Sequence, residues 1–211
     1  MDPNRKTRNK KIAERIITGL KSRYMEGFYA ETREEALQKA LELIPEGSSV
    51  SWGGTMSAEE IGLKKAMREG NYRVIERESA PPEEKRAREI EAYGCDYYLA
   101  SSNAITEDGV MINLDGNSNR VSCIAYGPLH VVMIIGMNKV VPDVETGIAR
   151  TRHEAAPINA QRFDINTPCK RTGACADCKS PDSICCNLLI TRLEHHPDRM
   201  KVILVGEDLG F

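Results

Sequence analysis

The stretch Ser48–Glu60 reads SSVSWGGTMSAEE and joins a short apolar segment, a pair of glycines and the start of a helix. Ser48–Trp52 has the composition of a buried strand. Ser57 and Glu60 have the spacing of a capping box, which predicts a helix that runs to Gly70. A strand that turns directly into a helix is typical of a parallel α/β sheet.

The same alternation continues on both sides of this stretch. A second capping box, Thr32–Glu35, predicts a helix that ends before Pro45. Downstream, the pattern predicts a strand at 72–75, a charged helix from Pro82 to about Gly94 and a buried strand at 96–100. Up to residue 100, the chain therefore predicts βαβ units with helices on both faces of a mainly parallel sheet.

The pattern changes after Ser101. Asp108-Gly109 and Asp115-Gly116 separate β-rich runs, which predicts tight turns and hairpins joined to the same sheet. The predicted elements are strands at 110–114, 121–126 and 130–136, a helix from 143 to about 156, and strands at 188–193 and 201–205. We expect the α/β class, with an open, mainly parallel sheet, a β-hairpin extension and a C-terminal cysteine-rich loop.

Composition excludes several classes of protein. The 211 residues carry 29 Lys and Arg against 31 Asp and Glu, a formal charge of −2, which removes the electrostatic case for a nucleic-acid partner. The longest apolar run, around Val131–Met137, is far shorter than the ~20 residues of a membrane span. The start of the chain is polar and basic with no apolar stretch behind it, so we expect no secretory signal and a cytoplasmic protein.

Residues 1–25 form a predicted basic helix that precedes a single domain at 26–211. Its apolar stripe comprises Ile12, Ile16, Ile17 and Leu20. We interpret its basic surface as solvated or as a contact between copies of the chain, because no aromatic residues are interleaved with the charges.

The glycine-containing turn is a candidate anion site. Unpaired backbone N–H groups and the helix dipole at a strand-to-helix turn favour a phosphate or carboxylate. Gly53 and Gly54 would allow close approach, and Thr55 and Ser57 would add hydroxyl donors. The alternative is a plain turn in which Ser57 only caps the helix.

A polar series follows the strand at 96–100. Asn103, Asn113, Asn117 and Arg120 are candidate ligand-binding residues, and the carboxylates of Glu107, Asp108 and Asp115 are candidate catalytic groups. Residues spaced by two share one face of a strand, so Asn113, Asp115 and Glu107 could converge across a hairpin. Carboxylates near Arg120 would serve as a general base, a hydroxyl acceptor or a cation ligand. Asp, Asn and Gly are also ordinary turn formers, so a structural role is the alternative.

Cysteines cluster near the C-terminal end, in the loop 168–186. Cys169, Cys175 and Cys178 have C-x5-C-x2-C spacing, and Cys185-Cys186 follow after six residues. Clustered thiols in a reducing compartment indicate metal or redox chemistry. Cys169, Cys175, Cys178 and Cys185 are the expected ligand set, for an iron–sulfur cluster or, alternatively, a zinc ion. Merely reduced thiols remain the other interpretation.

With these residues described, the chain resembles the lactate-utilization (LUD, formerly DUF162) domain family over about residues 30 to 211. The resemblance rests on residues 51–57, 104–109, 113–117, 126–128 and 136–141, together with Glu60, Gly62, Arg120, Arg150, Arg152, Ala156, Pro157, Asn159 and 167–169. It implies a fold similar to the superfamily of ribose-phosphate isomerase, glucosamine-phosphate isomerase and CoA-transferases. In that superfamily, ligands lie over glycine-rich strand-to-helix turns.

The residue patterns and the resemblance together lead to two hypotheses of function. The first is a protein of lactate or related redox metabolism that binds an anionic small molecule and a thiolate-ligated metal, with iron–sulfur oxidoreductase subunits as possible partners. The second is a metal-independent isomerase or transferase for a phosphorylated or CoA-linked molecule, with Glu107 as general base or nucleophile. A non-catalytic assembly subunit and a homo-oligomer are further expectations, and neither nucleic acid nor membrane is an expected partner.

Overall fold

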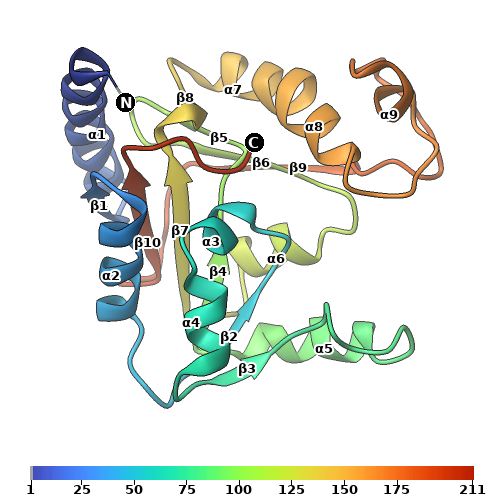
Figure 1. Cartoon of the computed structure of the whole chain (residues 1–211), viewed down its shortest axis with the longest axis horizontal. Helices are drawn as coiled ribbons and strands as arrows, with labels where there is room; N and C mark the ends of the chain where they lie inside the picture. Colours follow the sequence, from blue (N-terminus) through green and yellow to red (C-terminus); the bar gives the residue numbers. More distant parts are fainter. Residues whose placement is uncertain (1) are drawn as a thin grey trace.

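The computed structural model describes residues 2–211 and contains two sheets (Figure 1). The larger sheet has six parallel strands. In spatial order they are β1 (Glu26–Ala30), β10 (Met200–Val205), β7 (His130–Gly136), β4 (Tyr97–Ala100), β2 (Ser49–Trp52) and β3 (Arg73–Ile75). The chain is thus an α/β protein with a parallel sheet, as its sequence predicts.

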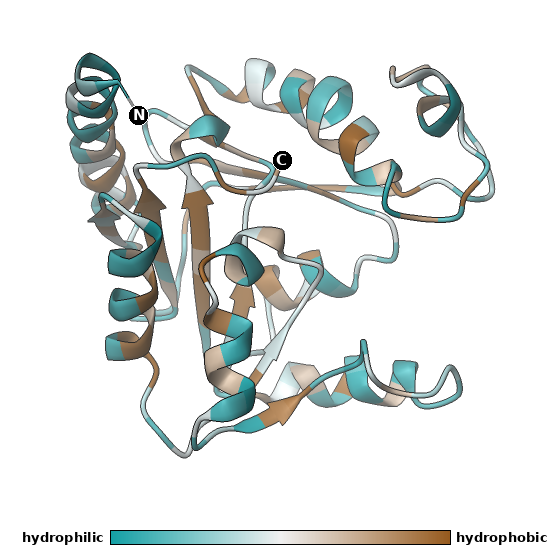
Figure 2. Ribbon diagram, viewed as in Figure 1, coloured by the Kyte–Doolittle hydropathy of each residue, from teal (hydrophilic) through white to brown (hydrophobic). Residues whose placement is uncertain are grey.

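Helices cover both faces of this sheet because alternate residues of each strand point to opposite faces. On one face, Val131 and Met133 pack with α1 (Pro3–Ser22) and α6 (Asn119–Ala125). On the other face, Val132 and Ile134 pack with three helices. These are α2 (Arg33–Leu43), α3 (Met56–Glu60) and α4 (Leu63–Glu69). The central strand β7 is brown along most of its length (Figure 2), as expected for a sheet buried on both faces.

The second sheet has four strands in the order β8 (Val140–Val141), β5 (Ala104–Thr106), β6 (Met111–Asp115) and β9 (Asn187–Thr191). Ile105 and Met111 face the main core, whereas Ala104 and Ile112 pack under α7 (Val144–Arg150). This small sheet therefore lies between the main core and the C-terminal helices.

The remaining elements connect the two sheets or extend from them. They are α5 (Lys85–Glu91) with the 3₁₀ turn η1 (Ala92–Gly94), the 3₁₀ turn η2 (Met137–Lys139), the π-helical segment η3 (Thr151–Ala155), α8 (Ala156–Ala160) and α9 (Pro168–Thr172). The turn η2 leads directly from β7 of the main sheet to β8 of the second sheet. Across residues 2–211, no helix combines the length and the hydrophobicity that a bilayer crossing requires.

Several sequence predictions about individual elements are wrong. The run 121–126, predicted as a strand, is helical, because Asp115-Gly116 leads into α6 and not into a hairpin. The hairpin at Asp108-Gly109 exists, but it belongs to the second sheet and not to the main one. Strand β1 was not predicted, and the predicted helix from Ser57 to Gly70 is interrupted at Gly62, whose φ is +78°.

Helix α1 packs into the core and against the β5–β6 turn. Its residues Ile12, Ile16 and Leu20 are buried in the main core. At Gly19, an added Cβ would lie 2.2 Å from the backbone oxygen of Asp108. The absence of a side chain at Gly19 therefore permits the close contact between α1 and this turn.

Gly19→Ala is expected to destabilise the protein by about 1–3 kcal/mol, because backbone atoms on both sides must move apart. Helix propensity alone predicts the opposite sign, a gain of roughly 1 kcal/mol. Urea denaturation measures the difference. Thr18→Ala, at an exposed position of the same helix, is the control and should change stability by less than about 0.5 kcal/mol. A stabilised Gly19→Ala protein would contradict the packing.

Candidate functional site

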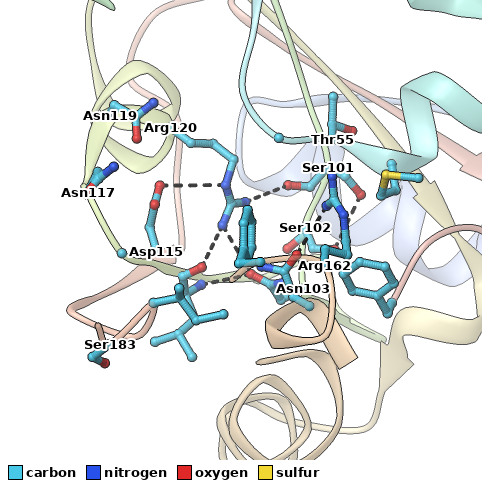
Figure 3. A pocket seen from close by; sticks show the side chains of 18 of the residues that line it. Thr55, Ser101, Ser102, Asn103, Asp115, Asn117, Asn119, Arg120, Arg162 and Ser183 are labelled. Carbon is cyan, nitrogen blue, oxygen red and sulfur yellow. Dashed lines mark hydrogen bonds and ion pairs between the residues drawn. The ribbon is translucent and has the colours of Figure 1, made fainter. Parts of the chain in front are cut away.

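A pocket of about 430 Å³ lies where the carboxyl ends of the main strands meet the second sheet. Its wall includes residues that follow β2 (Gly54, Thr55), residues that follow β4 (101–103), Lys139 of η2, and the segment from Leu114 to Arg120. Figure 3 shows the labelled members of this wall around a common space, with Arg162 and Ser183 from the C-terminal part of the chain. Ligands of open α/β sheets bind at this edge because helix starts and strand ends expose polar backbone groups there.

Arg120 organises one wall of the pocket. Its guanidinium donates to the backbone oxygens of Ser101 (3.3 Å) and Leu114 (2.7 Å). It also donates to the side-chain oxygens of Asn113 (2.7 Å) and Asn103 (3.3 Å), as Figure 3 shows in part. Asp115 lies 3.7 Å from Nε. The guanidinium thus has most of its hydrogen-bonding capacity used within the protein, and it joins the two sheets.

Lys139 lies at the inner end of the pocket and is only 3% exposed. Its Nζ donates to Ser57 Oγ (3.0 Å) and Ser101 Oγ (3.1 Å), and these hydroxyls are 3.2 Å apart. Burial, followed by repulsion from Arg150 and Arg120, lowers the pKa of Lys139 to about 7, although Glu60 opposes the shift. Near neutral pH, therefore, a substantial fraction of Lys139 is an uncharged amine.

Arg162 contributes a further cation to the pocket. Its guanidinium lies 5.6 Å from the ring centre of Phe163 and 5.8 Å from that of Phe211. It donates to Asn159 Oδ1 at 3.2 Å. In the described part of the chain, neither Arg162 nor Lys139 forms an ion pair with a carboxylate.

The structure separates the four residues of the predicted anion turn. Gly54 and Thr55 line the pocket, and nothing lies within 4 Å of a Cβ added at Gly54. Gly53 instead lies against Arg120, where an added Cβ would be 2.9 Å from Arg120 Cγ. Thr55, not Ser57, caps α3 by accepting from the backbone N–H of Ala58, and Ser57 is fully buried beside Lys139.

Most of the predicted polar series gathers at the pocket. Asn103, Asp115, Asn117 and Arg120 line it. Asn113 lies behind this wall, fully buried, and accepts from Arg120. Asp115 also accepts from the backbone N–H of Val121 at 3.1 Å, which holds the start of α6.

Glu107 and Asp108 do not line the pocket. Both lie in the β5–β6 turn, at the opposite end of these strands from Asn103 and Asp115. Glu107 pairs with Arg15 of α1 at 2.9 Å, and Asp108 pairs with Arg23. The pKa of Asp108 is lowered, first by a hydrogen bond from Thr106 and then by Arg23. The geometry gives both carboxylates a role in attaching the turn to α1, so the expected convergence of Glu107 with Asp115 does not occur.

The cysteine segment carries free thiols. Cys169 is buried in the first turn of α9, Cys175 and Cys178 are partly buried, and Cys185 and Cys186 lie at the surface. Desolvation and then repulsion from the other four thiols of the segment raise the pKa of Cys185 to about 11. Within residues 2–211, no group of three or more His, Cys, Asp or Glu side chains is arranged to hold a metal ion. The thiols therefore share a neighbourhood without forming a coordination shell.

Comparison with known proteins identifies the family. The profile of the LUD domain matches residues 13–205, which is most of the chain. The chain belongs to the LUD domain family. Membership of this family supports a function related to lactate utilization.

A solved structure has the same fold as this LUD domain. It is described as a DUF162 family protein from Deinococcus radiodurans, and it is 14% identical. The similarity covers 93% of this chain and 98% of that one, with a TM-score of 0.56. No curated protein matches the chain.

Sequence patterns did not predict three residues that line the pocket of this LUD domain, Lys139, Ser101 and Arg162. For two of them, the neighbouring sequence contains a feature that could have indicated a site residue. Ser101 directly follows a buried strand, and Lys139 is a charged residue between the apolar runs of β7 and β8. Arg162 had no such signal, because its position depends on how the C-terminal helices pack over the second sheet.

Lys139→Met is expected to make the protein more stable than the wild type near pH 7. The pKa of Lys139 is about 7 in the folded protein and near 10.5 when unfolded, so the unfolded state binds more protons between these values. Wild-type stability should therefore rise relative to Lys139→Met by about 2 kcal/mol between about pH 6 and about pH 9. Urea denaturation at both pH values measures this difference. A constant difference between the two proteins would contradict the lowered pKa.

Proposed function

We propose that the pocket binds an anionic small molecule that carries a phosphate or carboxylate group. The supporting observation is that Arg162 and Lys139 both line the pocket and have no carboxylate partner within residues 2–211. A ligand with a negative charge is attracted to cations that line the same pocket and lack carboxylate partners.

Arg162 is suited to direct contact with the anion. Its planar guanidinium presents several N–H donors, and only one protein acceptor, Asn159, engages them. The rings of Phe163 and Phe211 lie beside it. A guanidinium binds carboxylate or phosphate oxygens in pairs, which gives direction as well as affinity.

Other groups of the pocket fit the remainder of a small polar molecule. Thr55, Asn117 and Asn119 offer hydroxyl and amide groups, whereas Leu114 and Ile184 provide apolar surface. A volume of about 430 Å³ lies within the usual range for small-molecule sites, roughly 300–1,000 Å³. These features favour a phosphorylated or CoA-linked molecule, or a carboxylate, in a role related to lactate utilization.

Isothermal titration calorimetry with D-ribose 5-phosphate and with L-lactate tests anion binding and compares the two anionic groups. Arg162→Ala is expected to weaken binding of the preferred anion about 10-fold or more, because a charge-assisted hydrogen bond contributes ~1.5–3 kcal/mol.

The control is Arg73→Ala, at the start of β3 and outside the pocket lining. This variant should bind with wild-type affinity. The proposal fails if neither anion binds to the wild type, or if Arg162→Ala binds as tightly as the wild type.

We further propose that the cysteine segment binds a thiophilic metal, either an iron–sulfur cluster or zinc, through Cys169, Cys175, Cys178 and Cys185. Two observations support this proposal. The Cys185 thiol lies near enough to Cys169, Cys175, Cys178 and Cys186 for their charges to act on it, so the loop brings the five thiols into one neighbourhood. Cys186 is instead turned toward the backbone oxygen of Ser183, at 3.6 Å. Coordination requires these thiols to move closer together than they lie here.

Metal analysis of protein purified without oxygen tests the cysteine proposal. Cys178→Ser and Cys185→Ser are expected to lose most of the bound metal, whereas Cys186→Ser should retain it. A brown protein with iron and sulfide indicates a cluster, and a colourless protein with zinc indicates a structural site. Wild-type protein with neither metal, or equal loss in all three variants, would contradict the proposed ligand set.

A further inference from the structure

Ser57, Ser101 and Lys139 form a closed triangle of hydrogen-bonding groups, of which the anion site uses only Lys139. They come from α3, the end of β4 and η2. Lys139 Nζ lies 3.0 Å from Ser57 Oγ and 3.1 Å from Ser101 Oγ, and the two hydroxyls are 3.2 Å apart. Each of the three residues is at most 7% exposed.

The surroundings of Nζ favour an amine over a permanently charged ammonium. The charged groups that act on Lys139 from neighbouring elements are Arg150 of α7, Arg120 of α6 and Glu60 of α3. Both arginines repel the ammonium form, and no carboxylate in the described residues pairs with it. An ammonium also has three protons to donate, whereas Nζ has two hydroxyl partners. A buried lysine with a purely structural role would be more stable as an ammonium paired with a carboxylate.

The triangle has an inner and an outer member. Ser101 and Lys139 line the pocket, but Ser57 does not. The backbone of Ser101 is held by Arg120, which donates to its carbonyl oxygen at 3.3 Å. A nucleophile that faces a pocket, a base within hydrogen-bond distance and a third group that orients the base are the requirements of nucleophilic catalysis.

We propose that Ser101 is a nucleophile for acyl transfer, that Lys139 is its general base and that Ser57 is a positioning residue for Lys139. The donor would be a carboxylic ester or thioester. We expect the donor to carry a negative charge, and this part of the proposal rests on the proposed anion site. The reactivity of Ser101 does not depend on the anion site.

The reaction needs no reagent other than water. The Nζ lone pair takes the Ser101 hydroxyl proton while Oγ bonds to the acyl carbon, and the bond to the leaving group then breaks. The leaving alcohol or thiol receives the proton from Nζ, which restores the amine. Water next attacks the acyl-Ser101 ester as Lys139 removes its proton. This step releases a carboxylic acid and returns the proton to Ser101 Oγ.

A neutral serine reagent, phenylmethanesulfonyl fluoride, tests the triad on the intact protein, with peptide mapping by mass spectrometry. We expect a sulfonyl adduct on Ser101 that forms faster as the pH rises through about 7, the pKa of Lys139. Ser101→Ala should abolish this adduct. Lys139→Met should slow its formation by about 100-fold or more, the contribution expected of a general base.

Further variants separate catalysis from structure. Lys139→Arg keeps a positive charge but cannot accept the proton, so it should be as unreactive as Lys139→Met. Ser57→Ala should slow the reaction and shift its pH midpoint. Ser48→Ala, at a half-buried serine that donates to the backbone oxygen of Pro45, is the matched control and should react as the wild type does. Circular dichroism and thermal unfolding establish that each variant is folded.

The proposal is overturned if the folded wild type forms no adduct on Ser101 at any pH between about 6 and about 9. A wild-type rate in Lys139→Arg or Lys139→Met also overturns it. Because the reagent is uncharged, these outcomes are independent of the calorimetric test with anions. Failure of the triad and failure of the anion site can therefore be distinguished.

Discussion

The Arg120 guanidinium spans the junction between the two sheets, where it donates to Ser101 and Asn103 on one side and to Asn113 and Leu114 on the other. The chain leaves the main sheet at the end of β4, and backbone carbonyls there lack ladder partners. Arg120 supplies these partners from α6. Its side chain also packs over Gly53, which leaves no room for a Cβ at that position. The walls of the pocket thus depend on one buried network.

The same junction concentrates positive charge. Burial lowers the pKa of Lys139 most, and Arg150 and then Arg120 lower it further. A lysine in such surroundings lowers stability, which is typical of a residue with a functional role. The anion site and the Ser101 triad both use this feature. An anion would be attracted by the cations, and the uncharged amine would be available as a base.

Sequence patterns predicted every strand of the main sheet except β1, because the local sequence of each of these strands specifies its conformation. The capping boxes, the apolar strand Val131–Gly136 and the glycine turn after Trp52 each indicate their own conformation. The second sheet was harder to predict. Its strands have two to five residues, and the choice between extending the main sheet and forming a separate one depends on how α1 packs against the β5–β6 turn. The helix at 119–125 forms where β-rich composition predicted a strand, which is a tertiary override of propensity.

By itself, the sequence determined the α/β class, the turn at Gly54 and Thr55, and the polar set Asn103, Asp115, Asn117 and Arg120, because these positions follow directly from strand ends. Tertiary structure alone decided which carboxylates lie at the pocket. Glu107 and Asp115 are separated by the length of a hairpin, and only Asp115 is at the pocket end. It also decided the state of Lys139. A pKa depends on burial and on charges that are distant in sequence. The spacing of residues near Lys139 in the sequence predicts neither of them.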